Sequence, residues 1–299
     1  MAPQNVLFIL SDEHRRDIMG AYGNRFVRTP HLDRLAARGT RFSNAYTPCP
    51  ICVPARAALA TGRHVHETGH WDNAHPYHGA WPSWHHRLRA SGRDCSVIGK
   101  LHFRSTDDDN GFTEEIMPLH VLDGLGDLLG MIRNPPATRG NMPALAQEAG
   151  PGESSYTRYD RAIADAACAW LHERARQRDE RPWTLFVSFV LPHFPLIAPE
   201  EFFALYPLDQ VPLPRLTTAP DHPALAAMRR CMNYADHFDE ATRRRAIAAY
   251  HGMVSFLDHN IGRVLQALEE AGLTERTSVV YSSDHGDNLG NRGFWGKSV

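Results

Sequence analysis

Polar residues suited to holding a divalent cation follow two apolar runs that lie almost the whole length of this chain apart. Asp12 comes just after the run at 5–10, and Asp284 and His285 follow the run at 278–281. If both runs are parallel strands of one sheet, their carboxyl ends lie at the same edge. Carboxylate oxygens with one imidazole nitrogen suit a hard or borderline ion such as Ca²⁺, Mg²⁺ or Mn²⁺. An aspartate alone after a strand would indicate a helix cap or a turn, but two such segments together predict a metal site.

A cysteine and an arginine stand one helical turn apart in Cys52-x-Pro54-x-Arg56, and Thr-Gly-Arg follows at 61–63. In a helix opened by the proline turn, the two side chains lie on the same face. Cys49 and Cys52 could instead form a redox or zinc-binding Cys-x-x-Cys, but the chain has no second pair at comparable spacing and is larger than a small redox domain. A buried thiol without chemistry is the remaining alternative. The context of Pro54, Arg56 and 61–63 favours a reactive position.

Short apolar strands alternate with amphipathic helices along the chain. We expect strands at 5–10, 94–98, 184–190 and 278–281, and helices at 31–38, from 54 onward, at 82–91, 157–176 and 240–272. In the last helix, apolar residues recur every three or four positions between Ile247 and Leu268. This order predicts an α/β fold with a mostly parallel central sheet and helices on both faces. In such folds the ligand site lies at the carboxyl ends of the strands.

Two stretches interrupt this alternation. The stretch at about 106–155 contains three consecutive aspartates and a Pro-Pro pair, and we expect it to be an irregular surface excursion. The proline-rich stretch at 205–224 is expected to be a surface loop. No internal repeat is present.

Composition excludes several classes of partner. The 299 residues carry 32 basic and 34 acidic side chains, a formal charge of −2, so no general attraction to nucleic acid or to a membrane surface is expected. The five cysteines form no repeated framework, and the run at 5–10 is too short for a membrane span and lacks the basic residues that precede an export signal. We expect a globular protein in the cytoplasm. Its oligomeric state is left open.

The motifs resemble, in their order along the whole chain, those of the type I sulfatases of the alkaline-phosphatase-like superfamily. The matching segments are 5–12, 29–36, 52–56, 99–103, 192–195 and 283–297. The resemblance implies that a formylglycine-generating enzyme oxidises Cys52 to formylglycine after synthesis. The hydrate of this aldehyde carries two hydroxyls on one carbon, one to attack sulfur and one to drive the later release of sulfate.

The resemblance also implies a set of site residues. One divalent metal ion, Ca²⁺ or Mn²⁺, is expected on Asp12, Asp284, His285 and the modified Cys52. The cationic and proton-transfer residues around the sulfate are expected to be Arg56, Lys100, His102, His193 and Lys297. His193 is the candidate acid for the leaving group and His102 the candidate base, because imidazole transfers protons near neutral pH.

Two positions depart from the usual sulfatase pattern. Many sulfatases have a second Asp after the first and an Asn after the late Asp, whereas Glu13 and His285 stand here. The Asp284-His285 pair, with Asp72-Asn73, is more similar to the choline sulfatase and phosphonate monoester hydrolase branch. That branch commonly has Gln where this chain has Glu13, which we keep as a candidate metal ligand. Asn73 is a candidate substrate contact, with an Asx turn as the alternative.

Sulfatases usually continue beyond the Trp-Gly-Lys segment at 295–297 into further strands and a smaller C-terminal subdomain. By the resemblance, residues 1–299 form the N-terminal catalytic domain, with this C-terminal part absent. Three functions stay open: hydrolysis of small-molecule sulfate esters, hydrolysis of phosphonate monoesters or phosphodiesters by the same donors, and an inactive truncated fragment.

Overall fold

A computed structural model describes residues 4–126, 138–140, 142–177, 181–214 and 222–297. Its centre is a parallel sheet in the order β3-β2-β5-β1-β7. The strands are β1 (Asn5–Ser11), β2 (Asp94–Lys100), β3 (Glu114–Leu119), β5 (Trp183–Ser188) and β7 (Thr277–Ser283). Two short strands, β4 (Gly150–Pro151) and β6 (Ile197–Ala198), pair apart from this sheet. The predicted α/β class with a mostly parallel sheet is confirmed.

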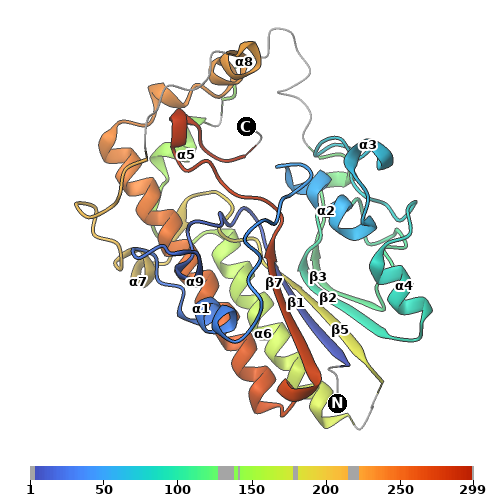
Figure 1. Ribbon diagram of the computed structural model, residues 1–299. Coiled ribbons are helices and arrows are strands. Elements are labelled where there is room, and N and C mark those ends of the chain that lie inside the picture. The colour runs from blue at the N-terminus through green and yellow to red at the C-terminus, as the bar shows by residue number, and fades with distance from the viewer. Residues whose placement is uncertain (1–3, 127–137, 141, 178–180, 215–221, 298–299) are drawn as a thin grey trace.

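Helices cover both faces of the sheet (Figure 1). The long helices α6 (Ser155–Arg176) and α9 (Glu240–Glu270) lie on one face, with α1 (Pro30–Ala37) beside α9. The helices α2 (Cys52–Thr61) and α4 (Trp84–Ala90) lie on the other. Alternate residues of β1 pack into the hydrophobic clusters on the two faces of the sheet, because successive side chains of a strand point to opposite faces.

Shorter helices and turns complete the described part of the chain. They are η1 (Gly20–Tyr22), α3 (Val65–Thr68), η2 (Leu122–Gly124), α5 (Met142–Gln147), α7 (Glu200–Phe203), α8 (Pro223–Met232), η3 (Tyr234–Asp236), η4 (Thr274–Arg276) and η5 (Asn291–Gly293). Among the described residues, no helix combines the length and the apolar character that crossing a membrane requires.

Local chemistry sets where the functional helices begin and end. The Ser154 hydroxyl accepts a hydrogen bond from the Thr157 amide at 3.1 Å and caps the start of α6. Asp239 caps α9 in the same way, through the Thr242 amide at 2.8 Å. Gly62, at φ 67°, ends α2 in the left-handed conformation that glycine adopts without strain. The helix that carries Cys52 and Arg56 therefore has ten residues and starts at the cysteine itself.

The expectation of an irregular excursion over about 106–155 needs correction, because β3 lies within it. The strand Glu114–Leu119 pairs in parallel with β2 at the edge of the sheet. Its residues, Glu-Glu-Ile-Met-Pro-Leu, lack an apolar run. An edge strand needs neither full burial nor every amide, so it tolerates charge and proline and leaves little trace in the sequence. Residues 127–137 and 141 of this stretch lie outside the described residues.

A close approach between β2 and β5 depends on Gly99. Its φ is +100°, and an added Cβ would lie 2.3 Å from the Ser188 carbonyl oxygen and 2.7 Å from Cδ1 of Ile163. Any side chain at position 99 would therefore push β2 away from both neighbours. The next residue is Lys100, so this packing fixes where that lysine leaves the sheet.

Candidate active site

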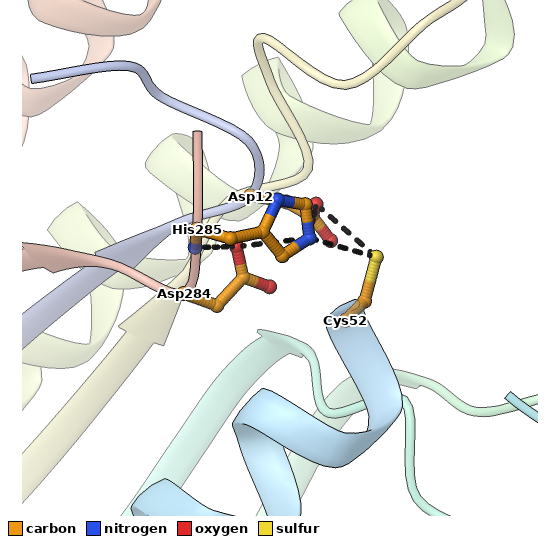
Figure 2. Close-up of side chains that lie close together, drawn as sticks. All are labelled: Asp12, Cys52, Asp284 and His285. Carbon is orange, nitrogen blue, oxygen red and sulfur yellow. Dashed lines mark hydrogen bonds and ion pairs between the residues drawn. The ribbon is translucent and has the colours of Figure 1, made fainter. Parts of the chain in front are cut away.

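Four potential metal ligands from three elements converge at the carboxyl ends of the strands (Figure 2). Asp12 follows β1, Asp284 and His285 follow β7, and Cys52 is the first residue of α2. One donor atom from each lies within 4.8 Å of all the others, and all four side chains are buried. The convergence on which the predicted site depends is therefore present in the structure.

The register of the sheet explains why residues so distant in sequence meet. β1 and β7 pair in parallel with Ser11 opposite Ser283, so the residues that follow each strand leave the sheet side by side. The Glu13 amide donates to Asp284 Oδ1 at 3.1 Å and joins the two loops. Helix α2 then brings Cys52 to this point from the other layer.

His285 is oriented as a metal ligand would be. Its Nδ1 lies 3.1 Å from the Gly286 carbonyl oxygen, which can only accept a hydrogen bond, so Nδ1 is the ring nitrogen that donates. Nε2 then has a free lone pair, and it lies 3.3 Å from Cys52 Sγ and 3.6 Å from Asp12 Oδ1. Two buried carboxylates and this nitrogen fit a divalent cation of the hard or borderline class. The residues present thus fit the expected divalent ion.

Arg56 lies behind the ligands and holds them. Its Nε donates to Asp284 Oδ2 at 2.8 Å, and Nη2 lies 3.5 Å from Asp12 Oδ2. Nη1 donates to the Lys100 carbonyl oxygen at 2.7 Å and to the Ser188 hydroxyl at 3.0 Å. The guanidinium is buried with these bonds made, so it serves as counter-ion to two ligands rather than as an open fork for an oxyanion.

Lys100 and His102 enter from the end of β2. The Lys100 ammonium is ion-paired with the Asp12 carboxylate. His102 has a φ of 59°, and its amide donates to the carbonyl oxygen of Leu119, the last residue of β3, at 2.8 Å. The edge strand that the sequence did not reveal therefore helps to place a predicted site residue. Within the described residues, His102 Nδ1 is buried without a hydrogen-bond partner.

Glu13, His193 and Lys297 form a second group beside the first. Glu13 Oε2 accepts from Lys297 Nζ at 2.9 Å and lies 3.7 Å from His193 Nε2. The Lys297 ammonium also lies 5.1 Å from the centre of the Phe194 ring. Asp12 is shared by both groups, whereas Glu13 belongs to the second alone. The structure thus places Glu13 next to Asp12 but outside the set of four converging ligands.

The charges of this region shift several pKa values. Burial alone would raise the pKa of Asp12, but Lys100, with His193, Lys297 and Arg56 behind it, outweighs burial and holds the pKa well below its usual range. Burial, reinforced by the Asp12 charge, raises the pKa of the Cys52 thiol to about 11. Burial, and then Lys297, lowers the pKa of His193 well below its usual range. Asp12 is therefore charged as a ligand must be, and Cys52 is a protonated thiol.

Asn73 takes a different position from a simple substrate contact. Its side-chain oxygen accepts from the Val53 amide at 3.2 Å, at the first turn of α2. The side chain thus caps the helix that carries Cys52, and its amide nitrogen is the part left for another contact.

Sequence reasoning missed residues that support the site from behind the sheet. The Tyr250 hydroxyl, from α9, donates to the Glu13 carbonyl oxygen at 2.6 Å and accepts from the Arg15 amide at 2.9 Å. The carboxylate of Asp160, from α6, accepts from two amides of the loop after β5. A polar group on the apolar face of a long helix was the available signal for both.

Comparison with known proteins agrees with this geometry. The sulfatase family profile matches residues 4–298. A choline-sulfatase of Rhizobium meliloti (strain 1021) is 31% identical over 303 residues, which cover 98% of this chain and 59% of that protein. The multifunctional alkaline phosphatase superfamily protein PehA of Trinickia caryophylli is 29% identical over 346 residues, covering 99% of this chain and 66% of that protein. This chain therefore spans roughly three fifths to two thirds of the length of these relatives.

Solved structures share the fold. The phosphonate monoester hydrolase of Agrobacterium radiobacter superimposes with a TM-score of 0.73 at 22% identity, covering 99% of this chain and 65% of that one. The structure of BT4656 in complex with its substrate D-glucosamine-2-N,6-O-disulfate gives a TM-score of 0.69 at 21% identity, covering 98% and 67%. Because the family profile matches residues 4–298 of the 299 and the motif residues meet at one edge of the sheet, the chain belongs to the sulfatase family.

Proposed function

We propose that this chain is the catalytic domain of a metal-dependent sulfuric ester hydrolase, which acts on small-molecule sulfate esters through a formylglycine made from Cys52. The observation that carries the proposal is the convergence of Asp12, Cys52, Asp284 and His285, with Cys52 inside the sulfatase motif. Membership of the sulfatase family supports the reaction class.

The unmodified thiol is poorly suited to be the nucleophile. Its pKa of about 11 leaves little thiolate at neutral pH, and the negative charge of the nearby Asp12 carboxylate disfavours further ionisation of the thiol. A hydrated aldehyde at the same position would present a hydroxyl oxygen instead of sulfur to the ligand group. A formylglycine-generating enzyme would have to act on Cys52 during maturation, before the first turn of α2 buries it.

Asp12, Asp284, His285 and the modified position 52 would hold the metal ion. When bound, a divalent cation supplies positive charge that lowers the pKa of a hydroxyl beside it and stabilises charge on the ester. Arg56 pairs with both Asp12 and Asp284 and would hold the two carboxylates oriented toward that ion. Of the two candidate metals, the nitrogen ligand His285 favours Mn²⁺ over Ca²⁺.

Lys100 and Lys297 supply fixed positive charge for a sulfate group. Both ammonium groups lie at the ligand cluster, Lys100 on Asp12 and Lys297 on Glu13. Their charges require no rearrangement when negative charge moves toward the leaving oxygen. The net effect is a cationic rim around an acidic, metal-binding centre.

His193 is the proposed acid for the leaving group. Its Nδ1 lies 2.6 Å from the Phe194 carbonyl oxygen and so carries a proton there, which leaves Nε2 as the atom that can bring a second proton. The resting pKa of His193 is low because the ring is buried beside Lys297. A bound sulfate ester adds negative charge next to the ring and raises that pKa toward the value that proton transfer needs. His102 is the proposed base, and its buried Nδ1 makes no hydrogen bond to the part of the chain that the structure describes.

A phosphonate monoester or phosphodiester hydrolase is the second candidate. The Asp284-His285 pair and the likeness in fold to a phosphonate monoester hydrolase favour it. The same cationic groups accept a tetrahedral phosphorus centre, so only a direct comparison of substrates separates the two reactions.

The deciding experiment is co-expression with a formylglycine-generating enzyme, followed by peptide mass spectrometry across Cys52 and assays of sulfate and phosphonate esters side by side. We expect conversion of the thiol to an aldehyde, bound metal, and faster turnover of sulfate esters. A preference for phosphorus esters by orders of magnitude would select the second candidate. A thiol that persists in this host, with no bound metal and no turnover, would leave an inactive fragment.

A further inference from the structure

Asp160 is a buried carboxylate in the middle of α6 that bonds to a loop of the site. Its side chain is shielded from solvent, at 0% exposed. Oδ1 accepts from the Val190 amide at 2.8 Å, and Oδ2 accepts from the Leu191 amide at 2.9 Å. Each oxygen thus holds one of two consecutive amides just beyond the end of β5. Burying a carboxylate in the middle of a helix costs free energy unless hydrogen bonds compensate for it, and here the two amides supply those bonds.

The amides that Asp160 holds belong to the turn that presents His193. The Val190 carbonyl oxygen accepts from the His193 amide at 3.1 Å. A continuous path of hydrogen bonds therefore runs from the Asp160 carboxylate through the Val190 peptide units to the backbone of His193. Among the described residues Asp160 forms no ion pair with a cationic side chain, so the two amides are its main partners.

One helical turn earlier, α6 also contacts the imidazole itself. The ring of Tyr156 meets the ring of His193 edge-on, with centroids 5.9 Å apart and an interplanar angle of 83°. Residues 156 and 160 are four apart and so share one face of the helix. The same face of α6 therefore fixes both the backbone that carries His193 and the orientation of its ring.

We propose that Asp160 is a positioning residue for His193, which holds the 190–193 turn so that Nε2 of the imidazole faces Glu13, Lys297 and the leaving-group side of the site. This inference rests on the proposed role of His193 as the acid. It assigns no chemistry to Asp160 itself, because no reacting group touches it. Asp160 should therefore affect the rate at which His193 transfers a proton to the leaving-group oxygen.

The test replaces Asp160 by Asn, which keeps the shape but exchanges one acceptor oxygen for an NH₂ group that faces an amide N–H. Asp165→Asn is the matched control, since Asp165 lies on the same helix with its side chain 64% exposed, in a surface pair with Arg263. Turnover is measured on a series of sulfate esters, from 4-nitrophenyl sulfate to sulfates of simple alcohols. Protonation matters little for the first and strongly for the last.

We expect Asp160→Asn to reduce kcat/KM for the alkyl sulfates at least tenfold more than for 4-nitrophenyl sulfate, a part of the roughly 10²–10⁴-fold that a general acid contributes. The combined variant Asp160→Asn with His193→Ala should behave as His193→Ala alone, and Asp165→Asn as the unaltered protein. An equal loss on all esters, or additive effects in the combined variant, would overturn the inference and leave Asp160 a purely structural residue.

A second measurement does not depend on turnover. ¹⁵N NMR of the histidine side chains, with His193→Ala for assignment, should show the Nδ1–H tautomer of His193 in the unaltered protein and a mixture of tautomers in Asp160→Asn. If the unaltered protein lacks sulfatase activity, the proposed function fails, and this spectrum still decides the positioning role. An unchanged His193 tautomer and line width in Asp160→Asn would contradict it.

Discussion

Arg56 Nε donates to Asp284 Oδ2 at 2.8 Å, and both side chains are withdrawn from solvent. The arginine of the sulfatase motif thus acts first on the protein's own carboxylates. Removing the charge of Arg56 would leave Asp12 and Asp284 as buried anions without their common counter-ion.

We expect Arg56→Ala to lower the free energy of unfolding by roughly 3–5 kcal/mol in metal-free protein, because breaking a buried ion pair strands the remaining charge. Arg56→Lys should recover part of this loss but not activity, since an ammonium cannot reach all four partners. Denaturant unfolding measures the change. The control is Arg176→Ala, which removes an exposed ion pair with Glu173 and should change little. Equal stabilities of Arg56→Ala and Arg176→Ala would contradict this view of Arg56.

Metal binding should separate the two groups of acidic residues. Asp284→Asn removes the charge of one of the four converging ligands. We expect the affinity for Mn²⁺ to fall by at least the roughly 10- to 100-fold that is typical for loss of a group that only supports a ligand. Glu13→Gln should change affinity by less than about tenfold, because Glu13 pairs with Lys297 outside the four. Isothermal titration of metal-free protein measures both. A larger loss in Glu13→Gln than in Asp284→Asn would restore Glu13 as a ligand.

Cys52→Ala should abolish turnover while leaving the fold intact. The side chain is small and buried at the start of α2, so its truncation should cost no more than about 1–2 kcal/mol of stability. Activity is compared with that of Cys168→Ala, which alters a half-buried cysteine whose thiol donates to the Arg263 carbonyl oxygen in α9 at 3.6 Å. Residual turnover in Cys52→Ala above that of a mock preparation would exclude position 52 as the nucleophile.

Acid should destabilise the protein through His85. Burial lowers the pKa of His85 to about 3 in the folded protein, from the ordinary value of 6.5. The unfolded chain therefore binds a proton below pH 6.5 that the folded chain refuses, so this contribution is full above pH 6.5 and is lost as the pH falls toward 3. Between pH 8 and pH 5 the loss from this residue should be about 2 kcal/mol.

The matched variant is His85→Asn, whose amide can replace the bond to the Asn110 carbonyl oxygen but cannot titrate. Denaturant unfolding at both pH values should show a smaller acid loss in His85→Asn than in the unaltered protein. Equal losses would mean that His85 is protonated in the folded state. The variant is expected to be less stable at pH 8, because it loses the stacking of the His85 ring on Phe112, whose ring centroids lie 4.1 Å apart.

The sequence predicted those parts of the fold that have strong periodicity. The apolar strands at Asn5–Ser11 and Thr277–Ser283 and the long helix α9 lie where their patterns place them. It did not predict β3, because an edge strand with Pro118 shows neither an apolar run nor alternation. The predicted helix at 82–91 is shorter, Trp84–Ala90, because Ser83 caps it.

The site divides in the same manner. The ordered motifs were enough to predict that Asp12, Cys52, Asp284 and His285 meet. They could not show that Glu13 turns toward Lys297, since this depends on a φ of 70° at Glu13 and on the position of the loop after η5. Nor could they reveal Asp160 or Tyr250, whose partners are backbone groups of distant loops.

Two of the four converging residues, Asp284 and His285, follow β7, which is an edge strand because it pairs with β1 alone within the described sheet. A metal ion bound by Asp12 after β1 and by Asp284 and His285 after β7 would link the two strands. Its binding free energy would then stabilise the pairing of β7 with the rest of the sheet. Chelation should accordingly loosen Thr277–Ser283 ahead of the interior strands, and amide hydrogen exchange along that strand would register it.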